Sequence, residues 1–212
     1  MRAEALADAA VVTGTVAYGE SDLVAHLFTR EHGRVAVFAR SARASRKRFP
    51  GLSAPQRGLA RFHARTGRDL LDLDELDVDP SIMNLAQDLR ALGHASYLCE
   101  LVERLLPEHE PSFDVFDAVD AALVRIARVG PSATLLRSLE LKLLLHTGYL
   151  PQLDAPMQGL LEADFAALPE VDDDVLRAVA RLFSAHLRHL GGAPLKSVAF
   201  LASLVAGPGG SR

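Results

Sequence analysis

The apolar residues of the chain change their spacing at Asp79-Pro80-Ser81. Before this point they occur in short runs that alternate with polar residues, and after it they recur every three or four residues. Alternation is typical of β-strands, whereas three- and four-residue steps are typical of amphipathic helices. The sequence therefore predicts an α+β fold: a β domain over 1–79, then an all-α helical domain over 80–206, with a disordered tail at 207–212.

The β domain is predicted to contain five short strands. The runs lie near 11–16, 23–28, 34–40, 57–65 and 70–78, with turn signals at Gly19 and Gly33. An open sheet of this size would leave unpaired strand edges, and closing the sheet removes them. We therefore expect a small closed or nearly closed barrel. Phe38 and Phe62 fall at strand positions that are expected to fill its core.

The helical domain is predicted to contain five helices. They cover 80–107, 113–128, 131–148, 172–189 and 194–205. The first and third begin at a Pro-Ser pair and the second follows one, and these residues suit a helix start because proline fits the first turn and serine caps it. Gly148 is expected to end the third helix.

Positive charge is concentrated in the predicted β domain. Residues 1–70 hold 12 Lys/Arg and 6 Asp/Glu, whereas 71–212 hold 11 and 21, and the whole chain has a net charge of −4. The stretch 40–49 holds five bases and no acid, and it is predicted to be a loop between two strands. Charge segregation of this kind usually marks a part of a protein that meets an anion. A solvated charge run without a ligand is the alternative.

The candidate DNA contacts are the bases of this loop and of the neighbouring strands. They are Arg34, Arg40, Arg43, Arg46, Lys47, Arg48, Arg57, Arg61 and Arg65. Guanidinium groups neutralise phosphates and stack on bases, and Phe49 or Tyr18 is expected to add a stacking platform. Binding of this kind would tolerate any base sequence and would weaken steeply with salt.

Motifs for enzymatic chemistry are absent from the sequence. It has neither a P-loop nor a G-x-S-x-G elbow, so no catalytic residue and no cofactor are predicted. The single cysteine, Cys99, excludes an intramolecular disulfide and favours a reducing compartment. His186 and His189 lack a third ligand, so we predict no metal site and expect partly exposed bases at a helix end. No run of about 18 apolar residues predicts a membrane span, and the N-terminus does not resemble a secretion signal.

Four segments occur in an order that is specific to one family. They are Tyr18-Gly-Glu-Ser-Asp22, Leu27-Phe-Thr-Arg-Glu-His-Gly33, Glu140-Leu-Lys-Leu-Leu-Leu-His-Thr-Gly-Tyr149 and His189-Leu-Gly-Gly-Ala-Pro-Leu-Lys-Ser197. In these segments the chain resembles the bacterial recombination mediator family RecO. The resemblance implies an oligonucleotide-binding (OB) barrel joined to a helical bundle.

The resemblance also implies a function. RecO-like proteins bind single- and double-stranded DNA and anneal complementary strands. They act with RecR on gaps coated by single-strand-binding protein so that RecA can load. A member of this family is expected to be cytoplasmic and associated with the nucleoid.

The chain departs from the family pattern after the Gly148-Tyr149 helix end. Many relatives carry a four-cysteine zinc module there, and in this chain the first cysteine pair falls on Pro156 and Gly159. No thiolate is present at these positions, so zinc is not expected. We predict a shortened, zinc-less insert near 150–170.

A protein-interaction adaptor without strong direct DNA binding is the alternative function. Four bases of the otherwise acidic helical domain could line a groove for an acidic peptide that ends in an apolar residue, such as the tail of single-strand-binding protein. They are Arg125, Arg128, Arg137 and Lys142. Solvated helix faces explain the same residues equally well.

Overall fold

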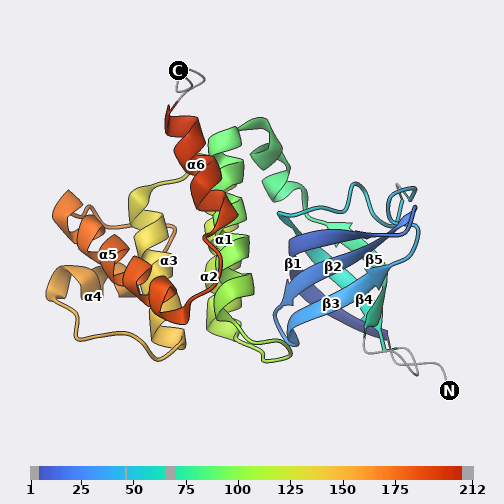
Figure 1. The fold of residues 1–212 in the computed structure, drawn as a ribbon, viewed down its shortest axis with the longest axis horizontal. Helices are drawn as coiled ribbons and strands as arrows, with labels where there is room; N and C mark the ends of the chain where they lie inside the picture. Colours follow the sequence, from blue (N-terminus) through green and yellow to red (C-terminus); the bar gives the residue numbers. More distant parts are fainter. Residues whose placement is uncertain (1–4, 46, 65–69, 207–212) are drawn as a thin grey trace.

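The computed structural model describes residues 5–45, 47–64 and 70–206. A β-barrel and a bundle of helices lie side by side, and helices α1 (Leu89–Leu105) and α2 (Phe113–Val129) stand between the barrel and helices α3 (Ala133–His146), α4 (Ala155–Glu162) and α5 (Asp173–Leu190) (Figure 1). The segment 207–212, for which a disordered tail is predicted, lies outside the described residues. No helix in the described part of the chain is long and apolar enough to cross a membrane.

The five predicted strands are confirmed. They are β1 (Ala5–Tyr18), β2 (Asp22–Thr29), β3 (Gly33–Ala39), β4 (Gln56–His63) and β5 (Leu71–Val78). They close into a barrel in the order β1-β2-β3-β5-β4, with β3 and β5 parallel and the other neighbours antiparallel. A small closed five-stranded sheet of this kind is consistent with the predicted OB fold. The basic stretch lies between β3 and β4, as expected.

Phe62 is fully buried in the core of the barrel, which confirms its prediction. Phe38 is buried as well, but it lies outside this core cluster, edge to face against Tyr18. Phe49, expected to offer a stacking platform, is fully buried among Ala42, Leu52 and the other core residues of the barrel. The prediction for Phe49 is therefore wrong, because the end of the basic loop folds back and places this ring in the core.

The helical domain contains six α-helices and one 3₁₀ helix among the described residues. They are η1 (Pro80–Gln87), α1 (Leu89–Leu105), α2 (Phe113–Val129), α3 (Ala133–His146), α4 (Ala155–Glu162), α5 (Asp173–Leu190) and α6 (Lys196–Ala206).

Two helix predictions need correction. The single helix predicted over 80–107 is divided at Asp88, whose carboxylate accepts hydrogen bonds from the backbone N–H groups of Arg90 (2.8 Å) and Ala91 (3.2 Å) and so starts a new helix. Helix α4 was not predicted. Asp154 caps it by accepting from the backbone N–H of Met157 at 2.9 Å, but its eight residues are too few to show a helical period.

The barrel and the bundle share an apolar junction. Val11 and Phe28 belong to strands β1 and β2, yet both pack in the core of the helical domain. The ring of Phe28 lies 5.3 Å from that of Phe116 on α2. Gly33 on β3 lies directly against the backbone of Glu110, and the backbone N–H of His109 donates to the carbonyl of Arg34 at 2.9 Å. The junction therefore holds one end of the barrel against the bundle.

Candidate nucleic-acid interface

The opposite end of the barrel, which we call the loop end, gathers three chain segments. The β1–β2 turn at 19–21 meets the start of the basic loop because Leu23 pairs with Ala39 across β2 and β3. The first residues of β5 join them because Phe38 pairs with Asp72. OB folds commonly bind oligonucleotides over strands 2 and 3 and the β1–β2 and β4–β5 loops. Strands β2 and β3 and the β1–β2 turn of the loop end belong to the corresponding region of this barrel.

Asp22 anchors the start of the basic loop. Its Oδ1 accepts a hydrogen bond from the backbone N–H of Ser41 at 2.7 Å, and Ser41 has a positive φ of 55°. Arg43 adds two bonds to the β1–β2 turn: its backbone N–H donates to the carbonyl of Ser21 and its Nη1 to the carbonyl of Glu20, both at 3.0 Å. Sequence reasoning missed Asp22 because its partner lies across the β2–β3 hairpin.

Four cations on the basic loop have no acidic partner among the residues that the structure describes. The loop cations, as we call them, are Arg40, Arg43, Lys47 and Arg48. All four are exposed, and none forms an ion pair within the described residues. Arg48 donates to the carbonyl of Arg40 at 3.0 Å, and its guanidinium lies 5.0 Å from the centroid of the Phe49 ring. Bonds to neutral carbonyls leave the positive charge uncompensated.

Tyr18 presents an aromatic surface beside the loop cations. Its side chain is 61% exposed, and its ring meets Phe38 edge to face with centroids 5.5 Å apart. Tyr18, Phe38 and Arg40 line a hollow of about 740 Å³ with Asp22 and Asp72. The prediction that Tyr18 could stack on bases is compatible with this exposure, whereas Phe49 is not available.

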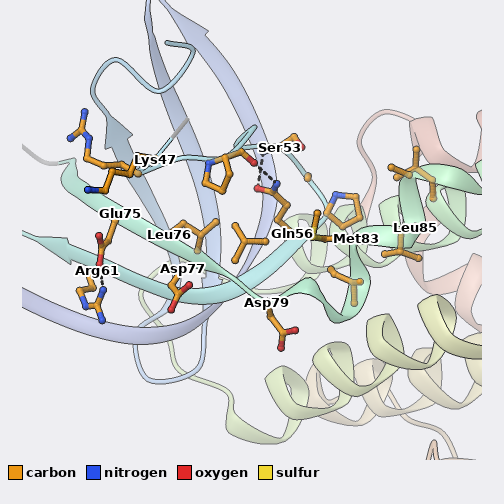
Figure 2. A pocket seen from close by; sticks show the side chains of 18 residues that line it. Lys47, Ser53, Gln56, Arg61, Glu75, Leu76, Asp77, Asp79, Met83 and Leu85 are labelled. Atoms are coloured by element: carbon orange, nitrogen blue, oxygen red, sulfur yellow. Dashed lines mark hydrogen bonds and ion pairs between the residues drawn. The ribbon is translucent and has the colours of Figure 1, made fainter. Parts of the chain in front are cut away.

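A groove extends from the loop cations toward the bundle (Figure 2). Its volume is about 560 Å³, and it runs between the basic loop, β5 and η1. Lys47 and Arg61 lie toward one end, and Met83 and Leu85 lie toward the other (Figure 2). Glu75 forms an ion pair with Arg61 and so compensates its charge. Of the two cations at this end of the groove, Lys47 therefore keeps its positive charge.

Arg34 and Arg57, both predicted to contact DNA, lie instead at the domain junction. Arg34 forms an ion pair with Glu103 at 2.6 Å and donates to the carbonyl of Leu106 at 2.6 Å. Arg57 forms a bidentate pair with Asp120 on α2, at 2.5 and 2.7 Å, and also pairs with Asp79. These guanidinium groups join the two domains, and their charges are paired with carboxylates and are not available to DNA.

A third arginine on the junction was not singled out from the sequence. Arg30, in the β2–β3 turn, forms a bidentate pair with Asp117 at 2.8 and 3.0 Å. The hydrogen bond from Arg30 holds the pKa of Asp117 below its ordinary value. Two further predicted contacts, Arg46 and Arg65, lie outside the described residues.

The structure does not bring the four predicted peptide contacts of the bundle into one groove. Arg137 forms an ion pair with the buried Glu140 at 2.9 Å. Lys142 faces another part of the bundle, where its Nζ donates to the carbonyl of Leu161 at 2.6 Å. Arg125 and Arg128 lie on α2 rather than α3. The predicted acidic-peptide groove is therefore not formed by these residues, because Arg137 and Lys142 bind partners on different sides of α3.

Glu140 makes the stability of the bundle depend on pH. Burial raises its pKa to about 7, although the charge of Arg137 and a hydrogen bond from Tyr97 at 2.8 Å act in the opposite direction. The folded state then keeps a proton that the unfolded chain releases near pH 4.5. Stability from this group is therefore present below pH 4.5 and is lost as the pH rises to about 7.

We expect chemical denaturation to show this loss as a difference between two proteins. From pH 4.5 to 7 the free energy of unfolding of the wild type should fall relative to that of Glu140→Gln, which has no proton to release. Other titrating groups are common to both proteins and cancel in the comparison. Parallel stability profiles would contradict the assignment.

The structure contradicts the prediction that His186 is a partly exposed base. It is buried, and its ring lies tilted against that of Tyr149 with centroids 4.3 Å apart. Burial, and then the neighbouring His189, lower the pKa of His186. Tyr149 covers it from beyond the end of α3, a contact that local sequence cannot show. No group of three His, Cys, Asp or Glu residues is arranged for a metal ion in the part of the chain described, and Pro156 and Gly159 lie on α4.

Together these features define a class: an OB-type barrel with a cationic, aromatic loop end, joined to an all-α domain. The family model described as "Recombination protein O N terminal" matches residues 1–79, and the one described as "Recombination protein O C terminal" matches residues 86–159. The chain belongs to the RecO family.

Relatives with this name occur in several bacteria. The DNA repair protein RecO of Anaeromyxobacter dehalogenans (strain 2CP-C) is 42% identical over 146 residues, which are 68% of this chain and 58% of that protein. The protein of the same name from Myxococcus xanthus is 34% identical over 148 residues, 70% of this chain and 61% of the relative. The one from Geobacter sulfurreducens is 38% identical over 147 residues, 69% of this chain and 60% of the relative. The match thus spans less than two thirds of each relative.

Proposed function

We propose that this protein binds single- and double-stranded DNA at the loop end of its barrel. The observation that carries the proposal is the grouping of four loop cations, which have no acidic partner in the described part of the chain, beside the exposed ring of Tyr18. A polyanion is the ligand that such a surface attracts, because each phosphate neutralised by a cation releases condensed counterions. The aromatic ring offers a platform on which any base can stack.

The proposed mechanism is non-covalent. Arginine and lysine contacts to phosphates leave the hydrogen-bonding edges of the bases free. Two complementary strands held on such a surface would be screened from mutual repulsion and could pair. Strand annealing therefore needs the loop cations and Tyr18 but no catalytic residue, and we propose that the protein is not an enzyme.

We further propose a role as a recombination mediator in DNA repair. The name of the relatives, DNA repair protein RecO, supports the repair role. The family resemblance suggests RecR and single-strand-binding protein as partners, with loading of the recombinase on coated gaps as the outcome. Such a protein would act in the cytoplasm, at the nucleoid.

The test is a titration of labelled single- and double-stranded oligonucleotides by fluorescence anisotropy at several salt concentrations, with strand annealing followed in parallel. We expect the logarithm of the binding constant to fall linearly with the logarithm of salt, with a slope of about −0.7 per phosphate contact on single strands. Weak binding that does not respond to salt would reject DNA binding and favour an adaptor role.

Tyr18→Ala is expected to weaken binding of single strands by about tenfold or more, because stacking on an aromatic side chain contributes about 1–3 kcal/mol per base. Tyr18→Phe is the matched control. It keeps the ring and the edge contact with Phe38, and should bind as the wild type does. Equal affinities for Tyr18→Ala and Tyr18→Phe would show that bases do not stack on this ring.

A further inference from the structure

A second hollow lies in the helical domain, on a surface that the proposed DNA contacts do not use. This helical groove has a volume of about 750 Å³ and lies between α2, α3 and α4. Val115, Leu161 and Phe165 are buried and line its floor. Leu145 also lines it and is 56% exposed. The groove is thus an apolar surface open to solvent.

The rim of the helical groove is acidic. Asp114, Glu162 and Asp164 are exposed there, and none of them is paired with a cation in the described part of the chain. Glu162 accepts a hydrogen bond from the side chain of Gln158 at 2.6 Å, and Asp164 accepts one from the backbone N–H of Ala166 at 2.9 Å. Both donors are neutral, and Lys142 attracts Glu162 and Asp164 electrostatically without forming an ion pair with either in the described part of the chain.

The cations around the groove offset this charge only in part, because Lys142 attracts Glu162 and Asp164 while the rim carries three acids. Lys142 points its Nζ to the carbonyl of Leu161 and over the ring of Phe165, 5.5 Å from its centroid. One further acid of the lining, Asp117, is already neutralised by Arg30. The groove therefore combines an apolar floor with a net negative rim, which is the opposite sign to the peptide groove expected from the sequence.

We propose that the helical groove docks a cationic amphipathic segment of a partner protein. A bulky apolar side chain of that segment would fill the floor over Val115 and Phe165, and Lys or Arg side chains would pair with Asp114, Glu162 and Asp164. Charge complementarity selects this partner, because anionic peptides and DNA are repelled by the same rim. Apolar anchors at helical spacing in a groove are a common mode of peptide recognition.

A second copy of this chain fits the groove less well. Its basic loop supplies cations, but Phe49, the large apolar residue at the end of that stretch, is fully buried in the barrel. The loop thus offers charge without an apolar anchor of its own, and the exposed ring beside it, Tyr18, lies at the end of strand β1 and not on a helix that could enter the groove. This distinguishes the proposed partner from self-association.

The experiment is a selection from a displayed library of random peptides of about twelve residues, a length that covers the anchors of a helix in a groove. The wild-type protein is the bait. The counter-selection uses Ala121→Trp, because Ala121 is an exposed residue of α2 that lines the groove, and an indole there would occupy the space. We expect the enriched peptides to combine Lys or Arg with a large apolar residue. The proposal would be overturned if acidic peptides were enriched, or if every enriched peptide also bound to Ala121→Trp.

An enriched peptide is then titrated against two charge variants of the folded protein, each checked by circular dichroism. Asp114→Asn, Glu162→Gln and Asp164→Asn together should weaken binding by about tenfold at low salt. The control, Glu170→Gln, Asp172→Asn and Asp173→Asn, removes the same number of exposed acids elsewhere and should bind as the wild type does. Equal weakening in both variants would mean attraction to net charge alone and would reject the groove.

Sedimentation of the wild type and of Ala121→Trp tests whether a second copy of this chain occupies the helical groove. We expect the two proteins to sediment alike. A wild-type dimer that Ala121→Trp abolishes would make a second copy the occupant and overturn the proposal. DNA binding at the loop end should be the same in all of these variants, so failure at the groove would leave the proposed DNA function untouched.

Discussion

Replacing the four loop cations together with alanine is expected to reduce the affinity for single-stranded DNA by about 100-fold at low salt. Arg40, Arg43, Lys47 and Arg48 are exposed and have no acidic partner among the described residues, so their charge is available to phosphates. Each lost phosphate contact should also flatten the salt dependence by about 0.7 in slope on single strands. Anisotropy titrations at several salt concentrations measure both effects.

The control for this variant removes the same charge from the bundle. Arg90, Arg181, Arg188 and Lys196 are exposed on helices α1, α5 and α6. Their joint change to alanine should leave both affinity and salt slope close to those of the wild type. If the two variants lost affinity equally, the protein would attract DNA by its overall field and not by the loop end.

Gly33→Ala is expected to lower the free energy of unfolding by about 2–5 kcal/mol, a large share of the stability of an ordinary domain. Gly33 has a φ of 68°, which costs a residue with a side chain about 1–2 kcal/mol. A Cβ at this position would also overlap the backbone of Glu110, at the junction between barrel and bundle. Backbone atoms cannot move aside as a flexible side chain can. Urea denaturation measures the loss.

Gly148→Ala separates the conformational cost of a positive φ from the cost of overlap with neighbouring backbone. Its φ of 74° is similar, but a Cβ there would meet no atom within 4 Å. We therefore expect only the conformational cost, about 1–2 kcal/mol. Similar losses in the two variants would show that the junction accommodates the extra methyl group, and that Gly33 is not held tightly against the bundle.

Much of the fold could be predicted from local pattern. The change of period at Asp79-Pro80-Ser81 separates strands from helices in the structure as in the sequence, because alternation and helical spacing each reflect which face of an element is buried. The helix predictions are wrong where a capping residue, and not the spacing of apolar residues, sets the start of a helix. Asp88 divides one predicted helix, and Asp154 starts α4, which is too short to show a period.

The candidate site could be predicted only in part. The sequence located a surplus of positive charge, and the loop cations lie within it. It could not distinguish free cations from paired ones, because the acids that bind Arg34 and Arg57 are Glu103 and Asp120, which lie on helices far along the chain.

The amino-acid sequence by itself determined the α+β plan, the barrel strands and the cationic loop, since these depend on composition and on spacing over a few residues. Only the tertiary structure decided which aromatic ring is exposed, Tyr18, and which is buried, Phe49. It also decided which arginines join the domains and which face solvent. The physical reason is that burial and ion pairing depend on contacts between segments that are distant in sequence and meet only when the chain is folded.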